Sequence, residues 1–376
     1  MAHAYTPGLK VVKNTVIRKS RLLPLKGEVL VQTGQLVKAE DVVAKTDLPG
    51  NVHPVNVANM LGIVPADIDH FMLQKQGEPV EKDQPIAMTK GFFGLFKSSC
   101  NAPADGTIEN VSEVTGQVLI RGVPIPVSVN AYVDGTVVEV MEKEGVVVET
   151  RGAFVQGIFG VGGEVCGILR VATDSPKRVM NVDDVPDDCE GQILLAGSLV
   201  TSGAVKKMIE HRAKGVVAGG ISDRDLREFL GYDIGVAITG SENLGITLVI
   251  TEGFGEINMA QSTFDIIKSN EGKRASINGA TQIRAGVLRP EVVIPLDASA
   301  EQTAESGADK VSGGLQVGSE VRVIREPYFG HLGTIVALPP ELQMLETESN
   351  VRVLEVEFED KKRAVLPRAN VEMIER

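Results

Sequence analysis

Two short clusters of glycine and acidic residues are the best candidates for a ligand site in this sequence. Each cluster directly follows an apolar run, the first at 216–218 and the second at 246–250. Such runs are typical of buried strands, and α/β domains bind their ligands at the carboxyl ends of these strands. If the chain has a ligand site, we therefore expect it there. The candidate residues are Gly219, Gly220, Glu252, Gly253 and Gly255.

Carboxylates in and near these clusters allow two interpretations. They could form an acid pair for proton transfer, or bind a cation. They could equally cap helices, because acids in a first turn interact favourably with the helix dipole. The pattern favours this second interpretation. The residues are Asp223, Asp225, Glu252 and Glu256.

The rest of the sequence contains no recognisable catalytic motif. Its five histidines are dispersed, and no serine or cysteine stands in a nucleophile elbow. Its three cysteines lack metal-ligand spacing, which fits a reduced cytoplasmic protein and argues against a zinc or iron–sulfur site. We therefore predict no catalytic residue, metal or cofactor. Whether the chain is an enzyme stays open, with a non-catalytic role favoured. These residues are His3, His53, His70, His211, His331, Cys100, Cys166 and Cys189.

The candidate ligand residues lie in a segment, 190–296, that alternates strand and helix patterns. This alternation predicts an α/β domain with a largely parallel sheet. Ser222 precedes one of the helices as a typical N-cap. Strands are expected at 193–196, 216–218 and 246–250, and helices at 203–213, 222–230 and 259–269.

The first half of the chain repeats two short patterns. Asp105-Gly106-Thr107 and Asp134-Gly135-Thr136 are each followed by apolar residues and by a second glycine, ten residues after the first. Each copy predicts a β-hairpin. The segments 34–44 and 77–87 also place glycine and apolar residues at identical spacings. Between those two segments, helices are expected at 55–61 and 65–73. Repetition of this kind indicates related structural modules.

These patterns, G-[QE]-x-V-x(5)-[VI]-A followed by P-x-D-G-x-[IV], resemble the barrel-sandwich hybrid fold of lipoyl- and biotin-carrier domains. In the carriers, a hairpin between the two halves holds a modified lysine. Here Leu48 stands at the lysine position of the lipoyl-like copy. Ala87-Met88-Thr89-Lys90 resembles a biotin hairpin, but its second methionine is replaced. The resemblance therefore implies an unmodified structural module, with modification of Lys90 as the alternative.

A phenylalanine-rich insertion follows Lys90. It lies between glycines and is flanked by Lys90 and Lys97. It could be an exposed apolar tip that contacts a partner or a membrane surface, or a loop packed over a neighbouring core. Its candidate partner-binding residues are Phe92, Phe93 and Phe96.

The last 60 or so residues resemble a KOW domain. A glycine start at Gly318, alternating valines and an aromatic-glycine turn at Tyr328-Phe329-Gly330 are followed by Gly-x-[IV]-Val. KOW domains are small SH3-like barrels found in transcription-elongation factors and ribosomal proteins. The resemblance makes Tyr328 and Phe329 candidate partner-binding residues. An acidic insertion at 338–350 departs from the family and favours a protein surface over RNA as the partner.

Composition restricts the partner classes further. The chain has 376 residues and a formal net charge of −12, which disfavours nucleic acid as a partner. The segment 10–26 is an exception, with six Lys and Arg residues and no acid. We find no signal-peptide pattern and no apolar run long enough to span a membrane, so we expect a cytoplasmic protein.

Together these features predict a mainly β, multidomain chain with one α/β domain. The Asp- and Pro-bearing stretch at 174–190 is expected to be a linker before the α/β domain. The expected parts are a barrel-sandwich-hybrid-like module at 1–125 with a helical insert at 54–73, a second small β module at 126–175, the α/β domain at 190–296, a linker at 297–315, and a KOW-like SH3-like barrel at 316–376.

Three functions are compatible with this organisation. The favoured hypothesis is a non-catalytic scaffold or adaptor that self-assembles or docks on transcription or translation machinery through protein–protein contacts. The first alternative is a ligand-binding protein or enzyme with its site in the α/β domain. The second is a nucleic-acid-binding protein that uses the KOW-like domain and the basic segment.

The favoured hypothesis generates a first prediction. Replacing Phe92, Phe93 and Phe96 together with serine is expected to leave the fold intact and to abolish association, because the insertion then lacks its apolar groups. Circular dichroism reports the fold and light scattering reports the association. Unfolding of the variant would instead identify the insertion as part of a core.

Overall fold

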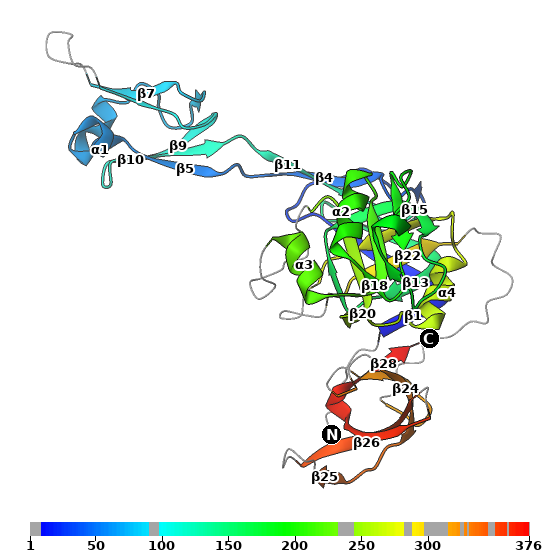
Figure 1. The fold of residues 1–376 in the computed structure, drawn as a ribbon. Coiled ribbons are helices and arrows are strands. Elements are labelled where there is room, and N and C mark those ends of the chain that lie inside the picture. Colours follow the sequence, from blue (N-terminus) through cyan, green and yellow to red (C-terminus); the bar gives the residue numbers. More distant parts are fainter. Residues whose placement is uncertain are drawn as a thin grey trace.

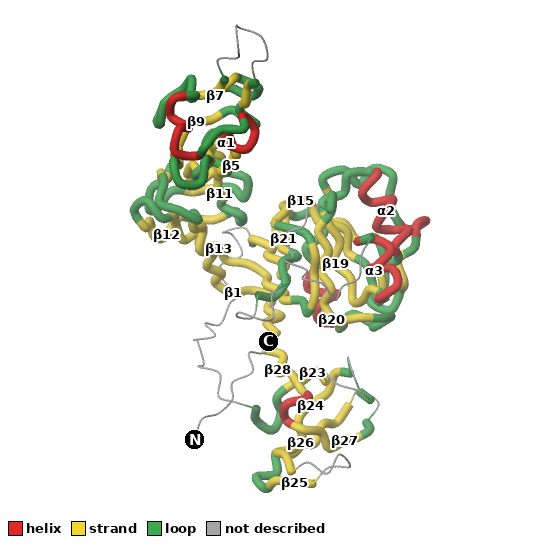
Figure 2. The backbone as a smooth tube through the Cα atoms, turned by 90° about the vertical axis from the view of Figure 1, so that its left-hand side faces the viewer, coloured by secondary structure: helices red, strands yellow, loops and turns green. Residues whose placement is uncertain are grey.

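The chain is mainly β, as its sequence predicts (Figure 1). The computed structural model describes residues 9–89, 98–231, 244–281, 288–296, 315–323, 327–328, 331–344, 350–358 and 361–375. A nested β module and a C-terminal β domain lie at opposite ends of the molecule, with a central domain between them (Figures 1 and 2). Among the described residues, no helix is both long and apolar enough to cross a membrane.

An outer β module is built from two separate parts of the N-terminal half. In this module β4 pairs with β2 and β11, and β12 pairs with β3 and β13. Its core consists mainly of small valine and alanine side chains, which suits short, closely packed strands. The strands are β2 (Glu28–Val29), β3 (Leu36–Val37), β4 (Val42–Leu48), β11 (Ile125–Asn130), β12 (Gly135–Met141) and the first half of β13 (Gly145–Gln156).

A second, nested module lies between β4 and β11 and has a core of its own. Its chain enters and leaves at one place, because the Gly122 amide donates a hydrogen bond to the Asn51 carbonyl oxygen at 2.8 Å. Its elements are β5 (Val52–Asn56), α1 (Val57–Leu61), the 3-10 helix η1 (Pro65–His70), β6 (Pro79–Val80), β7 (Pro85–Met88), β8 (Ser99–Asn101), β9 (Gly106–Ser112) and β10 (Gln117–Gly122).

The sequence repeats explain how the two modules are related. In the outer module the Gly34 amide bonds to the Val137 carbonyl oxygen at 2.7 Å, and in the nested module the Gly77 amide bonds to the Ile108 carbonyl oxygen at 2.8 Å. Asp134 and Asp105 likewise accept equivalent backbone hydrogen bonds, each at 2.7 Å. Each module therefore combines one copy of each repeat, in nested order. The sequence division at 125/126 instead separates strands that pair with one another.

The helical insert matches the sequence pattern at its first helix. Asn56 caps α1 through the Asn59 amide, and Gly62 ends it in the left-handed region at φ 65°. Pro65 begins the second helix as expected, but that helix is the single 3-10 segment η1 and ends at His70.

The central domain is an α/β domain whose sheet closes on itself. Strands β15, β17, β19 and β20 are parallel, whereas β13, β14, β21 and β22 pair antiparallel. Because β14 follows β13 after two residues, the order β13-β22-β21-β15-β17-β19-β20-β14 forms a barrel. The parallel sheet predicted from the sequence is thus one part of a mixed barrel. Its strands are β14 (Phe159–Val161), β15 (Glu164–Val171), β17 (Gln192–Leu195), β19 (Gly215–Ile221), β20 (Thr247–Phe254), β21 (Arg274–Asn278) and β22 (Glu291–Pro295).

Within the described part of this domain, three helices pack on the barrel. Helices α2 (Ser202–Glu210) and α3 (Asp223–Leu230) pack on the outer faces of β17, β19 and β20, and α4 (Gln261–Lys268) packs against the interior side chains. Thr201 caps α2, and Ser222 caps α3 as its sequence predicts. Alternate residues of each central strand contribute to the two cores, as the period of two requires.

The segment expected to be a linker, 174–190, instead forms a crossover between β15 and β17 that contains regular structure. It contains β16 (Val179–Met180) and the 3-10 helix η2 (Val182–Asp184), and β16 pairs with β18 (Leu199–Val200). Met180, Val185 and Cys189 are buried in the core beneath α2. The exposed Asp residues of this segment, Asp174, Asp183, Asp187 and Asp188, therefore surround a crossover with buried apolar anchors.

The C-terminal domain is a small β structure with its own core. It contacts the rest of the chain through a parallel pairing with β1 (Leu9–Leu22), in which Leu9 faces Ile374 and Lys10 faces Glu375. Its elements are β23 (Glu320–Val323), β24 (Leu332–Ala337), β25 (Leu342–Met344), β26 (Asn350–Phe358), β27 (Arg363–Pro367), the 3-10 helix η4 (Arg368–Asn370) and β28 (Val371–Glu375).

The nested organisation predicts that the two β modules fold separately. We expect a variant in which Asn-Gly replaces residues 49–124 to unfold cooperatively, because Leu48 and Ile125 already pair across the site of the new hairpin. We also expect the isolated segment 50–123 to fold around its own core. Thermal unfolding followed by circular dichroism tests both chains against the intact protein. An unfolded deletion variant would mean that the outer module depends on the nested one.

Candidate functional site

The structure brings the candidate ligand residues together at the carboxyl ends of the parallel strands. Gly219 and Gly220 end β19, Glu252 and Gly253 end β20, and Gly255 follows β20. Gly220 faces Gly253 across the two strands, and the Gly255 amide bonds to the Ile221 carbonyl oxygen at 2.9 Å. The candidate residues therefore lie next to one another, at the place in the fold where the sequence predicted them.

Close backbone packing accounts for the two adjacent glycines near the end of β19. A Cβ atom on Gly219 would overlap the Ile257 carbonyl oxygen, and one on Gly220 would overlap the Gly255 carbonyl oxygen. The segment after β20 thus lies directly on the strand ends, which leaves no space above these glycines for a phosphate group. Gly255 itself has φ +102°, a conformation that favours glycine in the covering turn.

A buried ion pair occupies the neighbouring end of β20. Arg322, from β23 of the C-terminal domain, donates through Nη1 to the Thr251 carbonyl oxygen at 2.7 Å and to Oε2 of Glu252 at 3.3 Å. The two side chains are 2% and 5% exposed. Oε1 of Glu252 accepts the Ala260 amide at 3.0 Å, just before α4. This carboxylate therefore binds both a helix terminus and a cation from another domain.

A small cavity beside this ion pair has a volume of about 30 Å³, room for about one or two waters. Leu9 and Val11 of β1, Thr263 of α4 and Leu332 of β24 line it together with the ion pair. Elements of the central and C-terminal domains thus meet here, around the Arg322 guanidinium group. In this arrangement the site can hold a cation but has no room for a metabolite.

Two of the other acidic residues, Asp223 and Asp225, lie in the first turn of α3, whereas Glu256 is exposed. Asp225 accepts hydrogen bonds from the Ser222 hydroxyl and from the Ser202 amide, and so connects α3 to α2. Burial raises the pKa of Asp225, but the hydrogen bonds from Ser222 and Ser202 outweigh it and lower the pKa overall. Asp223 pairs with Arg227 one turn along α3, at 2.7 Å. These contacts agree with the second of the two interpretations drawn from the sequence.

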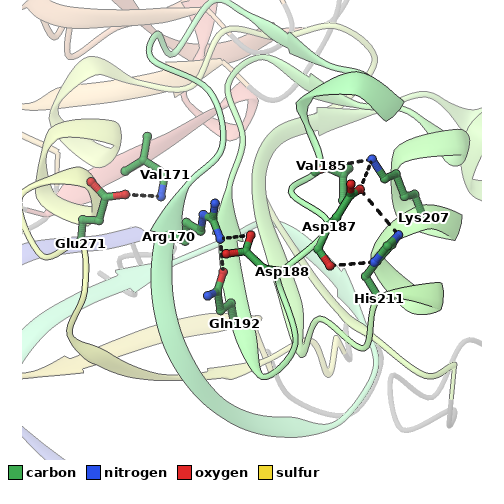
Figure 3. Close-up of polar contacts among 9 residues, drawn as sticks. All are labelled: Arg170, Val171, Val185, Asp187, Asp188, Gln192, Lys207, His211 and Glu271. Atoms are coloured by element: carbon green, nitrogen blue, oxygen red, sulfur yellow. Dashed lines mark hydrogen bonds and ion pairs between the residues drawn. The ribbon is translucent and has the colours of Figure 1, made fainter.

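Polar contacts at the crossover hold it against α2 and β17 (Figure 3). Lys207 bonds to Asp187 and to the Val185 carbonyl oxygen, each at 2.9 Å, and His211 Nδ1 lies 2.8 Å from the Asp187 carbonyl oxygen. A hydrogen bond from Lys207, and its charge, lower the pKa of Asp187. Arg170 bonds to Asp188 at 2.8 Å. Each of these side chains already has a backbone or ionic partner within the crossover, so their role here is to fix it in place.

The described residues contain no group of three or more His, Cys, Asp or Glu side chains placed to hold a metal ion. The three cysteines are poor nucleophiles as they stand. Burial raises the thiol pKa of Cys100 and Cys189. Burial also raises the pKa of Cys166, although hydrogen bonding and charge from Arg274 lower it in part. All three thiols therefore stay protonated at neutral pH.

The basic segment at the N-terminus is largely neutralised inside the fold. Four of its six basic side chains form ion pairs with acids of β13, β15, β22 and the β12–β13 turn. Lys19 contacts Glu291 at 2.6 Å, and the Arg21 guanidinium binds both carboxylate oxygens of Glu164. Most positive charges of this segment, which forms β1 and the residues after it, are thus paired with acids of the same chain.

The aromatic candidates have different outcomes. Tyr328 packs against the C-terminal core and stacks on Phe358, with ring centroids 5.0 Å apart. Part of its ring is therefore already packed within the C-terminal domain. The candidates Phe92, Phe93, Phe96 and Phe329, and also Lys90, lie outside the described residues.

Sequence reasoning did not identify Arg322 as a site residue. It stands between Val321 and Val323 in an alternating strand, where a charged residue normally faces solvent. Its burial depends on a contact with Thr251 and Glu252, about 70 residues earlier in the chain. No local signal in the sequence indicates that contact.

Comparison with known proteins gives no match to any protein-family model and none to any curated protein.

The packing over the strand ends generates a direct prediction. Gly220→Ala is expected to destabilise the protein by about 1–3 kcal/mol or more, because the new methyl group overlaps backbone atoms that cannot rotate away. Gly163→Ala is the matched control, since nothing lies within 4 Å of its added Cβ, and we expect a change within about 0.5 kcal/mol. Urea unfolding measures both. A neutral Gly220→Ala would show that the strand end is open.

Proposed function

We propose that this chain is a non-catalytic multidomain scaffold that acts through protein–protein contacts made by its nested module. The observation that carries the proposal is the placement of that module. It has a separate core, is inserted in the hairpin between β4 and β11, and projects away from the central domain (Figure 1). A module displayed in this way adds surface without adding to the core of the domain that carries it.

The far end of the nested module has an apolar surface that suits this role. Met60, Val64 and Val114 are 58%, 63% and 89% exposed. They lie on adjoining segments, because the turn that carries Val114 bonds to α1 through the Gly116 carbonyl oxygen and the Ala58 amide at 3.0 Å. We call these three residues the distal patch. Exposed apolar side chains gathered at one end of a domain are typical of a protein contact.

The two alternative functions have less support from the described contacts. The carboxyl ends of the parallel strands, where an α/β enzyme binds its substrate, are covered by the segment after β20 and filled by Arg322. Most basic side chains of β1 are paired with acids, which reduces the charge available for phosphate groups. Both observations favour a scaffold over an enzyme or a nucleic-acid-binding protein.

The resemblance of the C-terminal domain to KOW domains suggests a working environment. KOW domains act in transcription and translation, so a cytoplasmic scaffold that docks on such machinery is our specific form of the proposal. The acidic composition of that domain and the pairing of Glu357 with Lys361 and Arg363 favour a protein partner there too.

The solution mass of the protein tests the proposal. We expect the purified chain to form an assembly larger than its 40.1 kDa monomer, at both low and high salt, because apolar contacts are not screened. Serine at Met60, Val64 and Val114 together should return it to the monomer. A control variant with serine at three other exposed apolar positions, Val16, Leu22 and Val123, should leave the assembly unchanged.

A monomer under all conditions would overturn self-assembly and leave a different partner to be tested. The isolated segment 50–123 would then be immobilised and exposed to a lysate of the source cells. Retention of a protein that free wild-type segment displaces, and the distal-patch variant does not, would support the adaptor form. The absence of both assembly and competed retention would overturn the proposal as a whole.

A further inference from the structure

The cation that fills the end of the parallel strands comes from a different domain of the same chain. Arg322 belongs to the C-terminal domain, whereas Thr251, Glu252 and Ala260 belong to the central domain. Each part has its own hydrophobic core. The contact is therefore a docking contact between two folded units, and the central domain supplies all of its acceptor groups.

From that side, the end of β20 presents two oxygen acceptors in a buried setting. The Thr251 carbonyl oxygen and Oε2 of Glu252 both face Arg322 Nη1, at 2.7 and 3.3 Å. Oε1 of Glu252 is already satisfied by the Ala260 amide at 3.0 Å. The carboxylate is thus positioned by α4 rather than by Arg322. One negative charge and one carbonyl oxygen thus accept from a single guanidinium nitrogen, Nη1. A guanidinium group is more weakly hydrated than an ammonium group, so its burial at this place costs less.

The surrounding walls suit an alkyl chain attached to that guanidinium. Leu9 and Val11 of β1 line the same cavity, and both are buried. A site with apolar walls and a carboxylate at its base accepts an alkylguanidinium better than a bare inorganic cation. The two acceptors and the Ala260 amide belong to the central domain, so removing the Arg322 side chain leaves them in place. Leu332 of β24 completes the wall from the side of the C-terminal domain.

We propose that the end of the parallel strands is an alkylguanidinium-binding site and that Arg322 is its built-in ligand. The C-terminal domain then docks on the central domain by inserting this side chain, assisted by the two-residue pairing of β28 with β1. The candidate ligand site expected from the sequence is in this sense real, but the chain occupies it itself. This inference is independent of the scaffold proposal, since neither requires the other.

Chemical rescue tests the site. Arg322→Ala removes two methylene groups and the guanidinium, the fragment that ethylguanidinium replaces. We expect ethylguanidinium to raise the Tm of this variant saturably, with half-saturation on the order of millimolar, as befits so small a ligand. Wild-type protein should show no such rise, because its site is filled. Propylammonium, of similar length but more strongly hydrated, should have little effect.

A second variant assigns the binding to the carboxylate. Glu252→Gln in the Arg322→Ala background keeps the shape of the side chain but removes its charge. We expect it to weaken ethylguanidinium binding about tenfold or more, measured by calorimetric titration. If Arg322→Ala alone does not fold, the yield of refolded protein with each cation replaces Tm, with the same expected order. Equal effects of the two cations, no saturable effect in either measurement, or unchanged affinity after Glu252→Gln would overturn the proposal.

Discussion

The fold depends on one long strand that belongs to two cores. Val146 and Val148, in the first half of β13, lie in the core of the outer module, whereas Ala153 and Val155 in its second half face the interior of the central barrel. β1 pairs with β13 over this whole length, from Val11 opposite Val155 to Leu22 opposite Gly145. The two units are thus joined by one antiparallel ladder, which has a register shift between Val12 and Thr15. β14 then continues the same path and closes the barrel against β20.

Two ion pairs lie along the same β1 strand that joins the two units. The ion pairs of Lys19 and Arg21 join β1 to β22 and β15, beside the aromatic rings of Tyr132 and Phe154. The cluster therefore lies where the outer module meets the central barrel, and its pairs are half-buried. Pairs of this kind contribute more to the relative position of two units than to net stability, because desolvation offsets much of the attraction. The basic side chains of β1 thus find their acidic partners within the same chain.

Local features of the sequence predicted local structure well. Ser222 and Pro65 each stand at the start of a helix, as predicted, because their effect depends on their immediate neighbours. The repeats at 34–44 and 77–87 predicted related modules. They did not predict that 34–44 would pair with the repeat that starts at Asp134, and 77–87 with the one that starts at Asp105. Likewise the strand–helix alternation predicted parallel strands, while the closure through β13 and β14 rests on pairings far apart in the chain. Non-local pairing leaves no periodic trace in a single sequence.

The candidate site shows the same division between local and distant causes. Glycines and an acid at the ends of apolar runs indicate a place where backbone and charge come close together, which is what a ligand site requires. Glycine is needed equally where another part of the chain's own backbone packs closely. Gly220 packs in this way against the segment after β20. Glu252 needs a cation once it is buried, and Arg322 supplies one from another domain. A glycine-and-acid pattern therefore predicts that something packs tightly at a strand end, but only the tertiary structure decides whether that is a substrate or the protein itself.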